Sequence, residues 1–137
     1  MSRPKTKPSA ARIDQMLGEA SWLLSHAQAL ADYGRQEEAA AEWARAAECE
    51  EQVAYLLEAD GQDREAAIHR VSAASCYEEV GQYARAATLL RAALSVQLPA
   101  DYLARVEQQR ARCLVRARKE PRRRFPRKAR KPLPTVP

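Results

Sequence analysis

Three glycines set the strongest constraint on how this chain can fold. Gly34, Gly61 and Gly81 separate long runs of Ala, Leu, Glu, Gln and Arg, which are strong helix formers. Glycine readily adopts the left-handed backbone conformation in which many helices end. Each of the three is therefore predicted to end one helix and to turn the chain into the next. The expected fold class is all-α, built from antiparallel helical hairpins with no strand.

Apolar residues that recur at intervals of three and four predict about five helices between these turns. The first is expected to start near Ser9 or Ala10, Asp63 is predicted to cap the third, and Pro99 suits the first turn of the fifth. Alanine occupies 28 positions and aromatic residues only 6%, so the core is expected to depend on close helix approach. The expected helices cover about residues 9–33, 36–59, 63–80, 83–94 and 99–117.

The residues around two of the turns repeat at identical offsets. The set Ala74, Tyr77, Gly81, Ala86, Leu90 and Ala93 matches the set Ala27, Leu30, Gly34, Ala39, Trp43 and Ala46. Trp43 and Leu90 take the same place in the two sets, so both are predicted to be buried. Around Gly61 the same offsets are found again, in an overlapping frame, with Arg70 in that place.

These positions resemble the signature of a tetratricopeptide repeat, over most of residues 23–99. The two matches lie 47 residues apart, whereas that family repeats at 34, so the resemblance implies a short tetratricopeptide-like solenoid with a longer hairpin. In the family, the concave face binds a partner peptide. The resemblance therefore implies a non-catalytic protein–protein interaction module, an adaptor or scaffold. The residues expected on such a face are His26, Gln28, His69, Arg70 and Ser72.

Charge divides the chain into three parts. Residues 1–12 carry a net charge of +4, residues 13–109 carry −10, and residues 110–137 carry +11. A disordered basic arm is predicted over 1–10, a helical domain over 11–118, and a disordered Pro/Arg-rich tail over 119–137.

The basic tail leaves three interpretations open: a solvated segment, a tether to nucleic acid or the ribosome, and neutralisation of the acidic body within the same molecule. Basic tails bind phosphates without sequence preference, and Phe125 is the one aromatic residue in the tail that could stack on a base. The nucleic-acid tether is the alternative to the adaptor function. Its candidate residues are Arg116, Arg118, Lys119, Arg122, Arg123, Arg124, Arg127, Lys128, Arg130 and Lys131.

No pattern in the sequence points to an enzyme, a cofactor or a metal site. The three cysteines lack a CxxC spacing, which favours a reducing compartment and hence the cytoplasm. Arg64 and His69 match the loose Arg and His spacing of helical HEPN ribonucleases, but 18 arginines make such a match common by chance. No apolar run is long enough to cross a membrane, so a membrane is not expected to be a partner of this chain.

Overall fold

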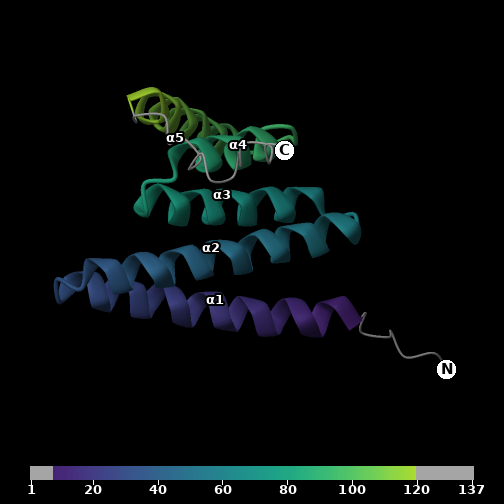
Figure 1. Cartoon of the computed structure of the whole chain (residues 1–137). Helices are drawn as coiled ribbons and strands as arrows, with labels where there is room; N and C mark the ends of the chain where they lie inside the picture. The colour runs from purple at the N-terminus through teal and green to yellow at the C-terminus, as the bar shows by residue number, and fades with distance from the viewer. Residues whose placement is uncertain (1–7, 120–137) are drawn as a thin grey trace, which may run out of the picture.

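The computed structural model describes residues 8–119, which form five helices and no strand. The helices stack in chain order, each packed against the next, from α1 at the bottom of Figure 1 to α5 at the top. This confirms the predicted all-α fold of about five helices in antiparallel hairpins. The expected disorder of the two basic ends lies outside the described residues, apart from residues 8–10 and Lys119, which are helical. The helices are α1 (Pro8–Asp32), α2 (Gln36–Ala59), α3 (Asp63–Glu79), α4 (Tyr83–Ala93) and α5 (Ala100–Lys119).

The three glycine turns share one backbone geometry. In each, the glycine has a φ of +78° or +79°, which only glycine adopts without strain. The N–H of the residue after the glycine donates to a carbonyl five residues earlier, at 2.9 Å in all three turns. This is the Schellman closure, and it satisfies carbonyls that the helix end leaves free. The closures join Arg35 to Leu30, Gln62 to Leu57 and Gln82 to Tyr77.

Each following helix starts directly from its turn. The carbonyl of Gln62 accepts the N–H of Ala66, so Gln62 occupies the cap position of α3. The prediction that Asp63 caps this helix is wrong: Asp63 is its first residue, where its carboxylate lies near the positive end of the helix dipole. Pro99 precedes α5 and accepts the N–H of Leu103 at 2.8 Å through its carbonyl.

Alanines at fixed offsets from the glycines form the helix contacts. Nine alanines, seven residues before and five and twelve residues after each glycine, are at most 1% exposed. Small side chains at these places let neighbouring backbones approach closely. The frame around Gly61 is therefore a true turn of the same kind as the other two. The nine are Ala27, Ala39, Ala46, Ala54, Ala66, Ala73, Ala74, Ala86 and Ala93.

Trp43 departs from the predicted equivalence with Leu90. Leu90 is fully buried, whereas Trp43 is only partly buried and packs at the edge of the main core cluster. The prediction that both are buried is wrong for Trp43, because an indole is too large to be enclosed by the small side chains of the alanine-rich surfaces around it. Leu23, Val53, Tyr77, Val106 and Cys113 complete the set of large, fully buried side chains.

Candidate protein-interaction surface

Two of the five predicted binding residues lie on α1, where they face different sides. His26 Nδ1 is hydrogen-bonded to Oε1 of Glu42 on α2 at 2.9 Å, and its ring stacks on Trp22 with centroids 4.7 Å apart. Gln28 donates to Asp32 of its own helix at 3.0 Å. Two residues along a helix are separated by about 200° of rotation, so the two side chains cannot line one surface.

The other three predicted residues lie on α3. His69 Nδ1 is hydrogen-bonded to Oε2 of Glu50 at 2.6 Å, and Glu50 is only 6% exposed. Arg70 donates to Glu58 at 2.9 Å. Ser72 is half-buried. Glu50 and Glu58 are eight residues apart on α2, which is about 12 Å along the helix.

The structure thus brings these residues into helix-to-helix pairs and does not gather them into one groove. His26, His69 and Arg70 each join their helix to α2 through a glutamate. These pairs help to fix the helices against each other, because a buried carboxylate such as that of Glu50 requires a partner. Their role in binding a partner stays a prediction.

A groove that the sequence analysis did not identify runs between α1 and α2. It has a volume of about 360 Å³ and holds charged groups of both signs around Met16 and Cys49. Burial, followed by the charge of Glu19, raises the pKa of the Cys49 thiol. The lining residues are Arg12, Gln15, Met16 and Glu19 from α1, and Arg45, Glu48, Cys49 and Gln52 from α2.

The groove does have a signal in the sequence. In each helix the four lining residues follow the spacing i, i+3, i+4 and i+7, which places them on one face. This spacing indicates a groove only when the two faces are known to lie against each other, because each face alone is typical of an ordinary polar helix surface.

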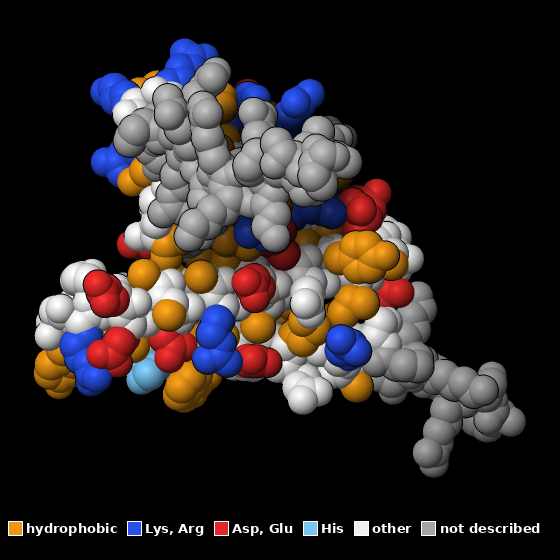
Figure 2. All heavy atoms as spheres, in the orientation of Figure 1, with side chains coloured by type: hydrophobic (Ala, Val, Ile, Leu, Met, Phe, Trp, Pro, Cys, Tyr) orange, Lys and Arg blue, Asp and Glu red, His pale blue; other side chains and the backbone are white. Residues whose placement is uncertain are grey.

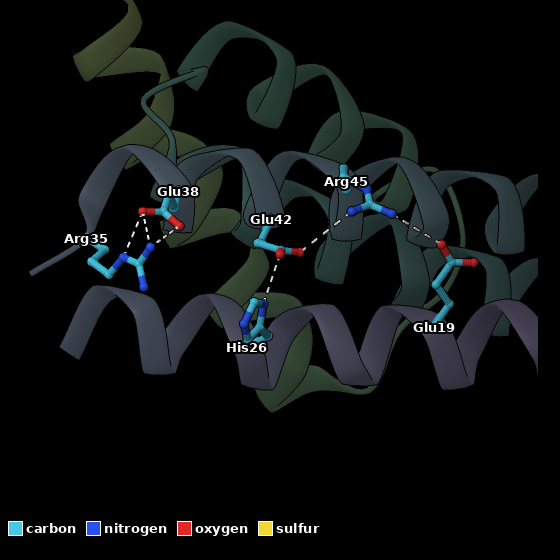
Figure 3. A network of polar contacts seen from close by, with 6 residues as sticks. All are labelled: Glu19, His26, Arg35, Glu38, Glu42 and Arg45. Atoms are coloured by element: carbon cyan, nitrogen blue, oxygen red, sulfur yellow. Dashed lines mark hydrogen bonds and ion pairs between the residues drawn. The ribbon is translucent and has the colours of Figure 1, made fainter. Parts of the chain in front are cut away.

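A polar network follows one side of the same helix pair (Figure 3). Arg45 lies 3.9 Å from Oε1 of Glu19 on α1 and 4.0 Å from Oε2 of Glu42, whose other carboxylate oxygen, Oε1, is hydrogen-bonded to His26. Arg35 and Glu38 form a separate pair at 2.7 Å near the turn. Arg45 and Glu19 belong both to this network and to the groove, so the network positions two of the groove's charges.

A second polar cluster joins α2, α3 and α4. Glu51 accepts hydrogen bonds from the hydroxyl of Tyr77 and from Arg85, whose guanidinium also lies over the Tyr77 ring, 4.4 Å from its centroid. Burial and the hydrogen bond to Glu51 raise the pKa of Tyr77. The side chains of this cluster pair with one another, and they join the three helices.

Charge is segregated along the stack. Helix α2 carries seven glutamates and one arginine, whereas α5 carries six basic and two acidic residues. In Figure 2 the charged side chains visible at the α5 end are mainly Lys and Arg, while Asp and Glu appear over the lower layers. A basic partner is therefore attracted to one part of the molecule and an acidic partner to the other.

Three of the predicted polyanion-binding residues are described, all in the last turns of α5. Arg116 donates to the hydroxyl of Tyr83 at 2.7 Å and lies over its ring, whereas Arg118 and Lys119 are exposed. Arg122, Arg123, Arg124, Arg127, Lys128, Arg130 and Lys131 lie outside the described residues.

Within residues 8–119, no group of three or more His, Cys, Asp or Glu side chains is arranged to hold a metal ion. All three cysteines are free thiols. No helix in this part of the chain has the length and apolar character needed to cross a bilayer.

The fold and the groove define a stack of helical hairpins with an open, charged surface between its first two helices. Comparisons with protein-family models, curated proteins and solved structures find no match.

Proposed function

We propose that this chain is a non-catalytic protein-interaction module, an adaptor or scaffold, that binds a segment of a partner polypeptide in the α1–α2 groove. The groove carries the proposal, because its eight lining residues combine charges of both signs with the less polar side chains of Met16 and Cys49. Such a surface suits an extended peptide better than a small apolar ligand, which prefers a closed and mainly hydrophobic pocket. The resemblance to tetratricopeptide repeats supports the same class of function.

The partner segment is expected to be basic. Helix α2 forms one wall of the groove through Arg45, Glu48, Cys49 and Gln52. Helix α2 as a whole carries seven glutamates and one arginine, and this net negative charge attracts a cationic segment and raises its rate of association. Cytoplasmic localisation belongs to the same proposal and is supported by the three free thiols.

Selection of random peptides on the immobilised full chain tests this function. Gln15→Trp fills the groove from α1, so the enriched peptides should lose affinity about tenfold or more, equivalent to about 1.4 kcal/mol. Thr88→Trp places the same side chain on an exposed site of α4 and serves as the matched control. Enriched peptides that are not basic, or that bind the Gln15→Trp variant as tightly as the wild type, would contradict the proposal.

Binding of nucleic acid through the basic C-terminal part is the second candidate function. It is favoured by the exposed Arg118 and Lys119 at the end of α5, which begin the run of basic residues. A chain that ends at Lys119 keeps Cys113, which is fully buried, and so retains the core contacts of α5.

If this candidate is right, the full chain binds mixed-sequence duplex at low salt and the chain that ends at Lys119 binds it much more weakly. The logarithm of affinity should fall with the logarithm of salt concentration, with a slope of roughly 0.9 per neutralised phosphate. Equal binding by the two chains, or no binding by the full chain, would rule out the tether.

A further inference from the structure

The outer side of α1 includes an uncharged segment. Helix α1 is the first layer of the stack and packs against α2, so its opposite side faces outward (Figure 1). Residues 20–31 contain no Asp, Glu, Lys or Arg, although such residues make up 30% of the chain. Trp22 in this segment is 60% exposed, and Tyr33, in the turn directly after α1, is 85% exposed.

One line of exposed residues runs along α1 and continues into the turn that follows it. Gly18, Trp22, Ser25, Ala29 and Tyr33 follow one another at steps of three and four, which is the spacing of a helix-packing seam. Three of them are small and two are aromatic. A neighbouring helix can therefore approach closely at the small residues, provided that it offers room for the two rings.

A second copy of the same helix offers that room. When two copies lie antiparallel about a two-fold axis between Ser25 and His26, Trp22 faces Ala29 of the copy and Tyr33 faces Gly18. Each large side chain then meets a small one. The axis also passes through the middle of the uncharged segment, so no like charges meet at the centre.

We propose that the stripe on α1 binds the same stripe of a second copy of this chain, forming an antiparallel two-fold dimer. A contact of this kind stops at two copies, because each copy uses the same surface to bind the other. The opposite end of the stack is unsuited to it, because α5 carries six basic and two acidic residues and a two-fold contact through it would bring like charges together.

The dimer is expected to be weak and reversible. The stripe from Gly18 to Tyr33 is about 22 Å long, because each helical residue adds about 1.5 Å. Contacts of this size lie at the low end of specific interfaces, which bury less than about 1,200 Å² in total. A dissociation constant on the order of micromolar is expected, or about −8 kcal/mol of binding free energy. The proposal does not depend on the groove, whose residues lie on the α2 side of α1 and on α2.

Sedimentation equilibrium of the full chain over a wide range of concentrations tests the dimer. The average mass should rise from that of one chain, 15.4 kDa, towards twice this value. Trp22→Glu places two carboxylates in the contact and should raise the dissociation constant at least about tenfold. Ala29→Glu, which alters the residue opposite Trp22, should do the same.

Tyr55→Glu is the matched control, because Tyr55 is 70% exposed and lies on α2. It should leave the dimer unchanged, and circular dichroism should show all three variants folded. A full chain that stays monomeric at its highest concentration would overturn the proposal. Dimerisation that survives both Trp22→Glu and Ala29→Glu, or that is lost equally in Tyr55→Glu, would also overturn it.

Disulfide trapping tests the antiparallel register. In Ser25→Cys the two new thiols lie beside the axis and should link the copies under mild oxidation. In Ser21→Cys they are separated by about 13 Å along the helices, beyond the reach of a disulfide. The wild-type chain, with its three native cysteines, shows the background. Linkage of Ser21→Cys as rapid as that of Ser25→Cys would contradict this arrangement.

Discussion

At the scale of single residues, the same offset from a turn glycine leads to different degrees of burial. Leu90 is enclosed by the core, whereas the Trp43 ring reaches its edge. The difference arises because a leucine side chain fills the space left between alanine-rich helices and an indole exceeds it.

Truncation of these two residues should follow their burial. Leu90→Ala is expected to lower the free energy of unfolding by about 2 to 5 kcal/mol, because it leaves a cavity in a closed core. Trp43→Ala should cost less than the 3 to 5 kcal/mol typical of a fully buried tryptophan, since part of its ring already contacts water. Urea denaturation of the two variants measures both values. A larger loss for Trp43→Ala than for Leu90→Ala would contradict this order.

The cysteines should differ in reactivity for the same reason. Burial raises the pKa of the Cys76 thiol to about 12 and that of the Cys113 thiol to about 11, so neither forms a thiolate at neutral pH in the folded protein. Cys49 is only half-buried. Maleimide labelling followed by mass spectrometry should therefore modify Cys49 first, and the other two only after unfolding. Cys49→Ala should remove the fast reaction, and rapid labelling of Cys113 would contradict the expectation.

At the scale of helices and turns, the three glycines do one structural task three times. Each turn needs a residue in the left-handed region, and after each turn the next helix begins two residues beyond the glycine. Gly18 is a different case, since it lies inside α1 and an added Cβ would meet no atom within 4 Å.

Alanine substitution should separate these two roles. Gly61→Ala is expected to destabilise the fold by about 1 to 2 kcal/mol, because the left-handed conformation strains a residue with a Cβ atom. Gly18→Ala should stabilise it by about 0.5 to 1 kcal/mol through the lower entropy of the unfolded chain. No atom crowds a Cβ at either site, so the backbone conformation alone distinguishes them. Thermal unfolding of the two variants gives the comparison, and a stabilising Gly61→Ala would contradict it.

A salt bridge joins α3 to α5. Arg112 donates to Glu78 at 2.7 Å, and this hydrogen bond, together with one from Gln109, lowers the pKa of the Glu78 carboxyl group. Because the folded state favours the charged carboxylate, Glu78 adds stability above its ordinary pKa of about 4.5 and loses this effect as the pH falls through the lowered value.

Glu78→Gln should therefore be less stable than the wild type at pH 7, by up to about 1 kcal/mol because Arg112 is half exposed. The difference should vanish in strong acid. Glu79→Gln, at the exposed neighbouring position, should have little effect at either pH. Denaturation curves at several pH values measure both variants, and a difference that grows on acidification would show that the sign is wrong.

At the scale of the whole molecule, the stack is assembled from contacts between consecutive helices. Helices in the middle are covered on two sides, and those at the ends on one. In such a chain of neighbour contacts, local opening is easier at the ends than in the middle.

Hydrogen exchange should reveal this gradient. Amides in the middle turns of α3 are expected to exchange more slowly than those in the last turns of α5, because Tyr77 and four alanines of α3 are buried against both neighbouring helices. Mass spectrometry of exchanged peptides measures the rates. Uniform protection from α1 to α5 would indicate that the stack opens only as a single unit.

The turns, the helix order and the alanine contacts could all be predicted from local sequence. Each turn is specified by residues within about twelve positions of it. These are the left-handed glycine, the helix formers on either side and the alanines at fixed offsets, so each turn depends on few other parts of the chain. Even the overlapping frame around Gly61 is visible in the sequence. The N-cap of α3 was misplaced by one residue, because Gln62 takes that position through its backbone alone.

The pairings between helices required the tertiary structure. Glu42, Glu50 and Glu58 look alike along α2, yet each pairs with a different predicted binding residue, and the groove combines matching faces of α1 and α2. The partial exposure of Trp43 likewise depends on the shape of the helix surfaces around it. These features depend on how one helix is rotated and shifted against another, which is set by side-chain packing over the whole interface.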